Sequence, residues 1–266
     1  MSGGWWRGLL SAHWQSALAY RGMMLVQTLQ SLLMPMVLLA AWLSVTKRPG
    51  AVYAEADYLL YFIGMPIVTN LSSCWIMYSL PGQIRDGTLS RDLLKPIHPL
   101  WTHVFDHIAA KAVMIIYLLP APIALGFWFR NRLPAVDLSL AHLALFVTAF
   151  LLAIVLRFFL GTLLAITGFW IEHVETLNLV LNAGVAALFG GMIVPVETFP
   201  HAIRTIAHVL PYRYTLSFPL EVLRGKLSAT ELQIGLAIGL AWTIGIFFLG
   251  RRLWIRGLRT WSAYGG

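Results

Sequence analysis

Six long apolar blocks constrain what this chain can fold into. They cover about residues 22–45, 58–80, 108–128, 138–170, 176–195 and 232–249. A helix that crosses the roughly 30 Å hydrocarbon core of a bilayer uses about 20 apolar residues, so each block is long enough to cross. Only helices and closed barrels satisfy their backbone groups in lipid, and these blocks lack the alternating pattern of barrel strands. We therefore predict an all-α, polytopic integral membrane protein with six transmembrane helices.

Composition supports this class and excludes others. The chain has 266 residues, of which 59% are hydrophobic and 11% are charged, and these figures exclude a disordered chain and an ordinary soluble domain. The net charge of +8 is typical of basic residues that flank membrane spans and meet anionic lipid, so the expected partner is the bilayer and not nucleic acid. The single cysteine, Cys74, excludes an intramolecular disulfide and a cysteine-based zinc site.

Charge also predicts the topology. An even number of spans puts both termini on one side of the membrane, and cytoplasmic termini place 11 of the 19 Lys and Arg residues on the cytoplasmic side. Four arginines directly after the last block are a strong stop signal. The residues expected on the cytoplasmic side are Arg7, Arg21, Arg85, Arg91, Lys95, Lys111, Arg157, Arg251, Arg252, Arg256 and Arg259.

Two segments depart from a simple pattern of spans. Residues 1–21 are rich in tryptophan at helical spacing and predict an amphipathic helix at the membrane interface. A full-length span without a cleavage site follows, so we expect the N-terminus to be retained. The block 138–170 is about 50 Å long as a helix, too long for one crossing, and predicts a single helix that projects into the cytoplasm before a polar turn.

The main cytoplasmic segment, residues 81–107, is polar but carries Leu89, Leu93 and Leu94. Gly87 is expected to end the preceding helix, Thr88 or Ser90 to cap the next one, and two prolines to stop it. The result is a short amphipathic helix parallel to the membrane, with an apolar face that another protein could bind. An ordinary interfacial loop fits the same composition.

A second unusual segment, residues 196–230, follows the fifth block. It is apolar, but prolines within it and at its start prevent one straight spanning helix. Short helices that dip into the outer leaflet before the last span fit better, and they would form a lid over a path between subunits. The candidate gate residues are Pro195, Phe199, Pro200 and Pro211.

In this order, the two segments resemble the membrane subunit of ATP-binding-cassette (ABC) exporters of the type 2 class, and more narrowly the bacterial type 2 permease family. The sequence departs from the family at Gln83, where an acidic residue is expected before the Ile-Arg-x-Gly element. Each motif is weak alone, but together they cover nearly the whole chain. They are Gly87, Leu89, Leu93, Leu94 and Pro96; Phe169-Trp170; Gly191, Pro195 and Phe199-Pro200; Leu210-Pro211-Tyr212; Pro219; Gly225; Trp254-x-Arg256-Gly257-Leu258; and residues 262–266.

The resemblance implies a single type 2 ABC permease domain over residues 1–266 in the bacterial cytoplasmic (inner) membrane. Such a permease pairs with a second copy, of the same or a related chain, and binds two copies of a separate ABC ATPase at its cytoplasmic loop. Mg-ATP would be bound by that partner, and this chain would hold no cofactor, metal or catalytic residue. The residues expected to couple to the ATPase are Asp86, Gly87, Thr88, Leu89, Arg91, Leu93, Leu94 and Pro96.

The sequence is consistent with an energy source outside this chain. Its only Gly-Lys pair, Gly225-Lys226, lacks the Gly and Ser/Thr that a phosphate-binding loop requires, since Leu220 and Leu227 occupy those positions. An ion-coupled secondary carrier is the alternative, although no carboxylate is expected within a span. An intramembrane hydrolase lacks its usual motifs.

Several polar residues within the blocks are candidates for a translocation path. Arg157 is the strongest candidate, because a charge in the bilayer is costly unless it is paired or hydrated. Its side chain could contact substrate, reach the inner surface or pair with Glu172. Asn70 and Gln30 could line the same path. His103 and His107 have the i, i+4 spacing of a metal pair, for which a solvated polar face is the alternative.

Overall fold

The computed structural model describes residues 5–46, 53–137 and 139–261. These residues form helices and connections without a strand, so the predicted all-α class is confirmed. Five helical segments among them are long and apolar enough to cross a membrane. They are Arg21–Ser44, Glu55–Arg85, Pro99–Trp128, Leu140–Phe169 and Ala229–Thr260.

The fifth predicted span, residues 176–195, is shorter than expected. Its apolar helix runs over Val174–Phe189 and comprises α9 (Val174–Asn178), a π-helical stretch (Leu179–Val185) and α10 (Ala186–Phe189). The chain turns at Gly190 and Gly191, and the φ of +88° at Gly191 is one that L-residues rarely adopt. This helix is shorter than the roughly 20 residues of a typical span, so the sixth crossing stays a prediction.

A separate helix, α1 (Trp5–Ala19), precedes α2 (Arg21–Val45). Ala17 of α1 packs against Ala109 and Val113 of α6 (Pro99–Leu118). A helix therefore forms where the interfacial helix is predicted, and its position at the membrane surface stays a prediction. Residues 1–4 of that segment and the motif at 262–266 lie outside the described residues.

Two of the spans are interrupted. Segment 55–85 divides into α3 (Glu55–Ser72) and α4 (Ile76–Arg85), and segment 99–128 divides into α6 and α7 (Pro120–Trp128). Proline explains the second interruption because its ring disfavours helix continuation, but no proline lies at residues 73–75. The first interruption is therefore a feature that the apolar block did not predict.

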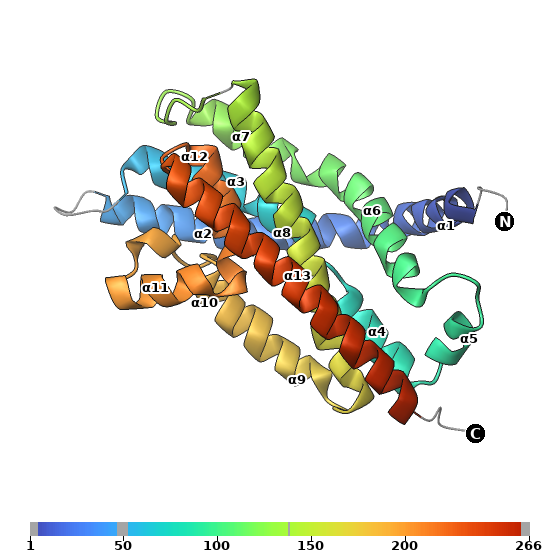
Figure 1. The fold of residues 1–266 in the computed structure, drawn as a ribbon. Helices are drawn as coiled ribbons and strands as arrows, with labels where there is room; N and C mark the ends of the chain where they lie inside the picture. The colour runs from blue at the N-terminus through green and yellow to red at the C-terminus, as the bar shows by residue number, and fades with distance from the viewer. Residues whose placement is uncertain (1–4, 47–52, 138, 262–266) are drawn as a thin grey trace.

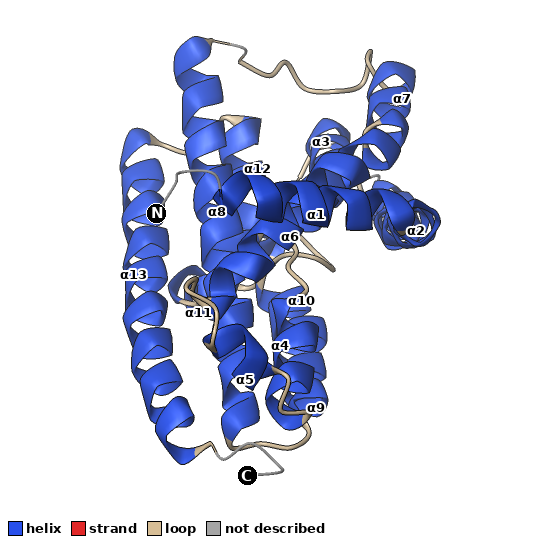
Figure 2. Ribbon diagram, turned by 90° about the vertical axis from the view of Figure 1, so that its right-hand side faces the viewer, coloured by secondary structure: helices blue, strands red, loops and turns tan. Residues whose placement is uncertain are grey.

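The centre of the molecule is α8 (Leu140–Ile166), which continues as a 3₁₀ turn (Thr167–Phe169). This is the single long helix that the sequence predicts. It packs along α13 (Ala229–Thr260), as Figure 2 shows, and also contacts α4 and α12 (Ser217–Arg224). Figure 1 shows the short helix α5 (Leu89–Leu93) near the C-terminal end of α13, whereas α11 (His201–Val209) and α12 lie toward the opposite end.

Small residues let α13 approach its neighbours within this chain. A Cβ at Gly235 would overlap the ring of Phe218, and a Cβ at Gly239 would lie 2.9 Å from a methyl group of Leu152. The Gly-x-x-x-Gly pair thus serves packing inside one subunit.

We expect Gly235→Ala to lower the stability of the protein, because the added methyl group has no space beside Phe218. Overpacking of a filled core costs about 1–3 kcal/mol. The matched control is Gly245→Ala in the same helix, where a Cβ meets nothing within 4 Å. Thermal unfolding in detergent should show a loss for the first variant alone, and equal melting temperatures would contradict the packing argument.

Candidate functional site

The predicted coupling segment forms a turn and a short helix at one end of the bundle. Helix α4 ends at Arg85, and Gly87 adopts a φ of +73°, which reverses the chain before α5. The predicted break at Gly87 is therefore confirmed. Thr88 occupies the N-cap position of α5 as expected, but its side chain makes no capping hydrogen bond, and the Ser90 hydroxyl donates to the Gly87 carbonyl at 2.6 Å.

The three leucines of this segment differ in their exposure to the surroundings of the bundle. Leu89 is fully buried and packs with Leu80, Ile84 and Trp254 in one core cluster. Leu94 is 88% exposed and Leu93 is 37% exposed. One leucine therefore anchors the segment to the bundle while two are displayed outward. The other predicted coupling residues at the surface are Asp86, Thr88, Arg91 and Pro96.

Aromatic side chains join the coupling segment to the ends of α8 and α13. The Trp261 indole N–H donates to the Ile84 carbonyl at 3.1 Å. The ring of Phe169 lies 5.6 Å from that of Trp254 and 6.1 Å from that of Trp261, centroid to centroid. A displacement of the segment would therefore be transmitted to both long helices.

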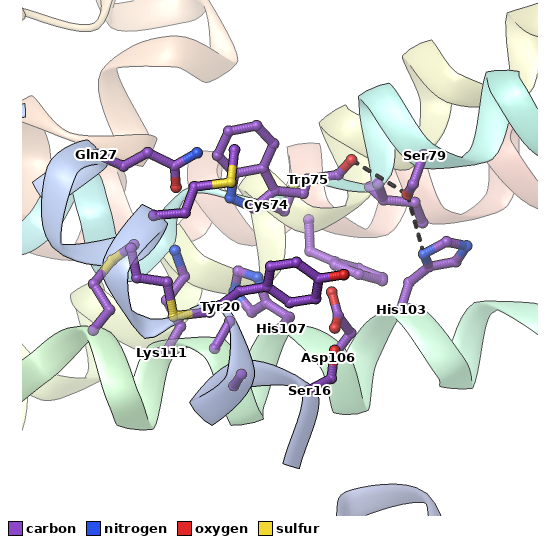
Figure 3. Close-up of a pocket in the computed structure, with 17 residues that line it drawn as sticks. Ser16, Tyr20, Gln27, Cys74, Trp75, Ser79, His103, Asp106, His107 and Lys111 are labelled. Atoms are coloured by element: carbon purple, nitrogen blue, oxygen red, sulfur yellow. Dashed lines mark hydrogen bonds between the residues drawn. The ribbon is translucent and has the colours of Figure 1, made fainter. Parts of the chain in front are cut away.

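A cavity of about 250 Å³ lies between α1, α2, α6 and the break between α3 and α4 (Figure 3). Its walls combine apolar and polar groups. The polar lining residues are Ser16, Tyr20, Gln27, Cys74, Ser79, His103, Asp106, His107 and Lys111.

Lys111 is central to this cavity and explains the break in the span. Its ammonium group donates to the Ser73 hydroxyl at 2.6 Å and to the carbonyl of Asn70 in the last turn of α3. A cation at a helix C-terminus is favourable because the unpaired carbonyls carry partial negative charge. Lys111 is only 8% exposed, so its ammonium group lies inside the bundle and not on its outer surface. The sequence feature that indicated this burial is a lysine inside an apolar block.

The histidine pair faces the same cavity. His103 lies 3.3 Å from the Ser79 hydroxyl, and Asp106 pairs with His13 at 3.2 Å. In the part of the chain that the structure describes, no group of three or more His, Cys, Asp or Glu side chains could hold a metal ion.

The predicted path residues do not converge on one surface. Asn70 is buried at the helix break, and its side chain donates to the Pro66 carbonyl at 2.8 Å. Arg157 lies next to the break, with its carbonyl 3.6 Å from the Cys74 sulfur, and no ion pair links it to Glu172 among the described residues. Gln30 is exposed on α2, whereas Gln27, one turn earlier, lines the cavity.

The opposite end holds a buried ionic network that sequence reasoning missed. Asp57, at the start of α3, accepts from Lys226 at 2.7 Å and lies 3.9 Å from Arg224. Arg224 also pairs with Glu197, which accepts a hydrogen bond from Tyr53. In the sequence, the only indication of this network is that carboxylates lie close to Arg and Lys residues within segment 196–230.

A second ion pair lies nearby, between Arg213 and Glu221. Their side chains are 6% and 0% exposed. The Arg213 Nε donates to Glu221 at 3.3 Å, and the Ser217 hydroxyl donates to the same carboxylate at 2.8 Å. The Tyr61 hydroxyl donates to the Gly191 carbonyl at 2.7 Å. The Arg213 pair holds segment 190–226 together internally, whereas the Tyr61 bond and the Asp57–Lys226 pair attach this segment to α3.

The predicted gate residues belong to this attached segment. Pro195 and Pro211 are buried, Phe199 is half-buried and Pro200 is exposed. Short helices α11 and α12 form within residues 196–230, so the prolines do interrupt it as expected. The Trp42 indole N–H donates to the Ile193 carbonyl at 3.0 Å and joins the segment to α2.

His208, at the same end of the molecule, predicts that the stability of the fold depends on pH. Burial lowers its pKa to about 4, and the positive charges of Arg213 and Arg204 act in the same direction. Below the ordinary pKa of about 6.5, the unfolded chain binds a proton that the folded chain does not, so stability should fall as pH decreases from about 6.5 to 4. Thermal unfolding across this range should show a smaller loss for His208→Gln, and identical profiles would contradict the assignment.

The comparisons with known proteins agree with this architecture. The family model described as ABC-2 family transporter protein matches residues 25–265, which is most of the chain. The chain belongs to this family. It is a multi-pass membrane permease of the ABC transporter class, and the resemblance inferred from the sequence motifs is confirmed. The ABC-2 permease is the transport component and is not itself catalytic, and it typically works with an ATPase partner. Searches of curated proteins and of solved structures found no match.

Proposed function

We propose that this ABC-2 permease is the translocating subunit of an ATP-driven exporter, and that it works as a dimer with two copies of a cytoplasmic ATPase. The observation that carries the proposal is the coupling segment. It displays Leu93 and Leu94 outward, is anchored by Leu89, and is joined to the long helices through Trp254 and Trp261. An ATPase that binds the two leucines would have a rigid connection to α8 and α13.

We further propose six crossings with both termini in the cytoplasm of a bacterium, within one permease domain over residues 1–266. The position of α5 near the end of α13 supports placing the coupling segment and the C-terminus on one side (Figure 1). The apolar helix over Val174–Phe189, together with the turn that follows it, is the proposed fifth crossing.

Mg-ATP would be bound by the ATPase, and closure of the ATPases would switch the two permease halves.

Asn70 and Arg157, on either side of the helix break, are the proposed path residues, and Gln30 on the outer face of α2 would reach a path only between two subunits. The segment with Pro195, Phe199, Pro200 and Pro211 would form the external gate.

The test is an affinity purification of the tagged chain from native membranes in mild detergent, followed by mass spectrometry. We expect an ABC ATPase in a 1:1 ratio to the permease, and the same experiment shows whether the second permease is the same chain. Recovery of the folded chain alone would contradict the proposal and favour an ion-coupled carrier.

A further inference from the structure

The cavity beside the helix break carries an unbalanced positive charge. Lys111 is buried in its wall and lies about 18 Å along α6 from the start of that helix. Its charge interacts with that of Arg157, and both cations lie near Cys74. Neither cation has a carboxylate partner among the described residues. Ionisable groups within membrane helices are costly and are almost always paired, so this arrangement lacks a counter-ion.

The acidic residue that lines the cavity does not supply that counter-ion. Asp106 is on α6, but its side chain is 52% exposed and pairs with His13 of α1. The deep part of the cavity, next to Lys111, therefore has no negative group of its own.

Several donors around Lys111 have unused hydrogen-bonding capacity. An ammonium group has three N–H donors, and Lys111 uses two of them on Asn70 and Ser73. The His107 Nε2 is buried without a partner in the described structure. The Gln27 amide also lines the cavity and makes no hydrogen bond within the described residues. These three groups come from α2 and α6 and surround one space (Figure 3).

The remaining walls are apolar and the rim is exposed. Met24, Ile76, Met114 and Phe158 line the inside. Met23 lines the cavity at its edge and is 62% exposed. Such a site suits a ligand with one charged end and an apolar remainder, because the charge meets Lys111 while the chain leaves along the methionines.

We propose that this cavity binds the negatively charged headgroup of an amphiphile, with Lys111 as its counter-ion and Gln27 and His107 as further donors. The assignment rests on the proposed transport function, for which it names the substrate class as an anionic amphiphile. The headgroup can come from a transported molecule or from a bilayer lipid, because both present the same chemistry to Lys111.

The test measures binding of laurate and of its uncharged amide, lauramide, to the full permease in neutral detergent micelles by native mass spectrometry. Loss of a buried ionic partner costs about 2 kcal/mol or more, so laurate should bind on the order of 30-fold more tightly than lauramide. Lys111→Gln should remove this preference. The matched control is Arg132→Gln, which removes an exposed cation elsewhere and should leave the preference unchanged.

A second variant separates binding from folding. Lys111→Gln also removes the cap on α3, so it could weaken the fold. Ala110→Phe keeps Lys111 and fills the cavity that Ala110 lines, and it should abolish laurate binding while the melting temperature is retained. Equal binding of laurate and lauramide by the unmodified permease would overturn the proposal. So would an undiminished laurate preference in Ala110→Phe.

The source of the headgroup is decided by competition. Loss of laurate binding after addition of phosphatidylglycerol would support a bilayer lipid as the occupant, and unchanged binding would support a transported anion. These measurements use the permease without its ATPase. Their failure would therefore leave the co-purification result, and with it the exporter proposal, unaffected.

Discussion

Replacing both Leu93 and Leu94 by aspartate should release the ATPase from the permease without unfolding the bundle. Both side chains are exposed, and Leu94 is 88% exposed, so neither contributes much to the core. In the proposed complex the two leucines become buried, and a charge placed in a desolvated apolar contact costs several kcal/mol. We expect at least a tenfold loss of co-purified ATPase, measured against the tagged permease.

The control for this prediction is an equally exposed leucine at another position. Leu140 is 87% exposed at the start of α8, nearly the same as Leu94. Leu140→Asp should retain the ATPase, whereas Leu94→Asp alone should weaken its binding. Unchanged co-purification with the double variant would reject the coupling segment as the docking site.

The largest expected effect on stability comes from the pair Arg213 and Glu221. Glu221→Leu leaves the Arg213 guanidinium buried without its carboxylate. Removal of one partner of a buried ion pair costs about 3–5 kcal/mol, because the remaining charge is uncompensated. We expect a loss of this size in the free energy of unfolding, measured by denaturant titration in detergent.

A double-mutant cycle distinguishes this explanation from a simple packing defect. Arg213→Met combined with Glu221→Leu removes both charges, so the double variant should be more stable than either single variant. The exposed pair Arg132 and Glu55, 3.2 Å apart, is the comparison. Arg132→Met should cost less than about 1 kcal/mol, since exposed ion pairs contribute little. Additive losses in the buried pair would contradict the argument.

These two predictions concern opposite ends of the permease. The coupling segment is attached at one end by Leu89, and the segment with Glu221 is attached to α3 at the other end through Asp57 and Tyr61. The helices α8 and α13 run between the two ends and pack along each other. A movement that begins at the coupling segment would therefore reach the segment with Glu221 through these two packed helices.

The sequence alone determined the properties that depend on local composition. Only helices and closed barrels are stable in lipid, and continuous apolar runs lack the alternation of barrel strands, so the helical class followed directly. The turn at Gly87 and the interruption of segment 196–230 by prolines also followed, because glycine adopts a positive φ without steric cost and proline lacks the N–H that a helix interior needs. The displayed pair Leu93 and Leu94 was recognised because apolar side chains in a polar segment are unusual.

Tertiary structure decided the properties that depend on residues far apart in the chain. The break at residues 73–75 has no local cause, since it is stabilised by Lys111 from another helix. The short helix over Val174–Phe189 and the pairing of Asp57 with Lys226 were also unpredicted. The cavity depends on several helices that are far apart in the chain and on a lysine whose carboxylate partner is absent among the described residues. Sequence shows which charges a chain contains, but only the folded arrangement determines which of them are neutralised, because charge interactions depend on distance and burial in space.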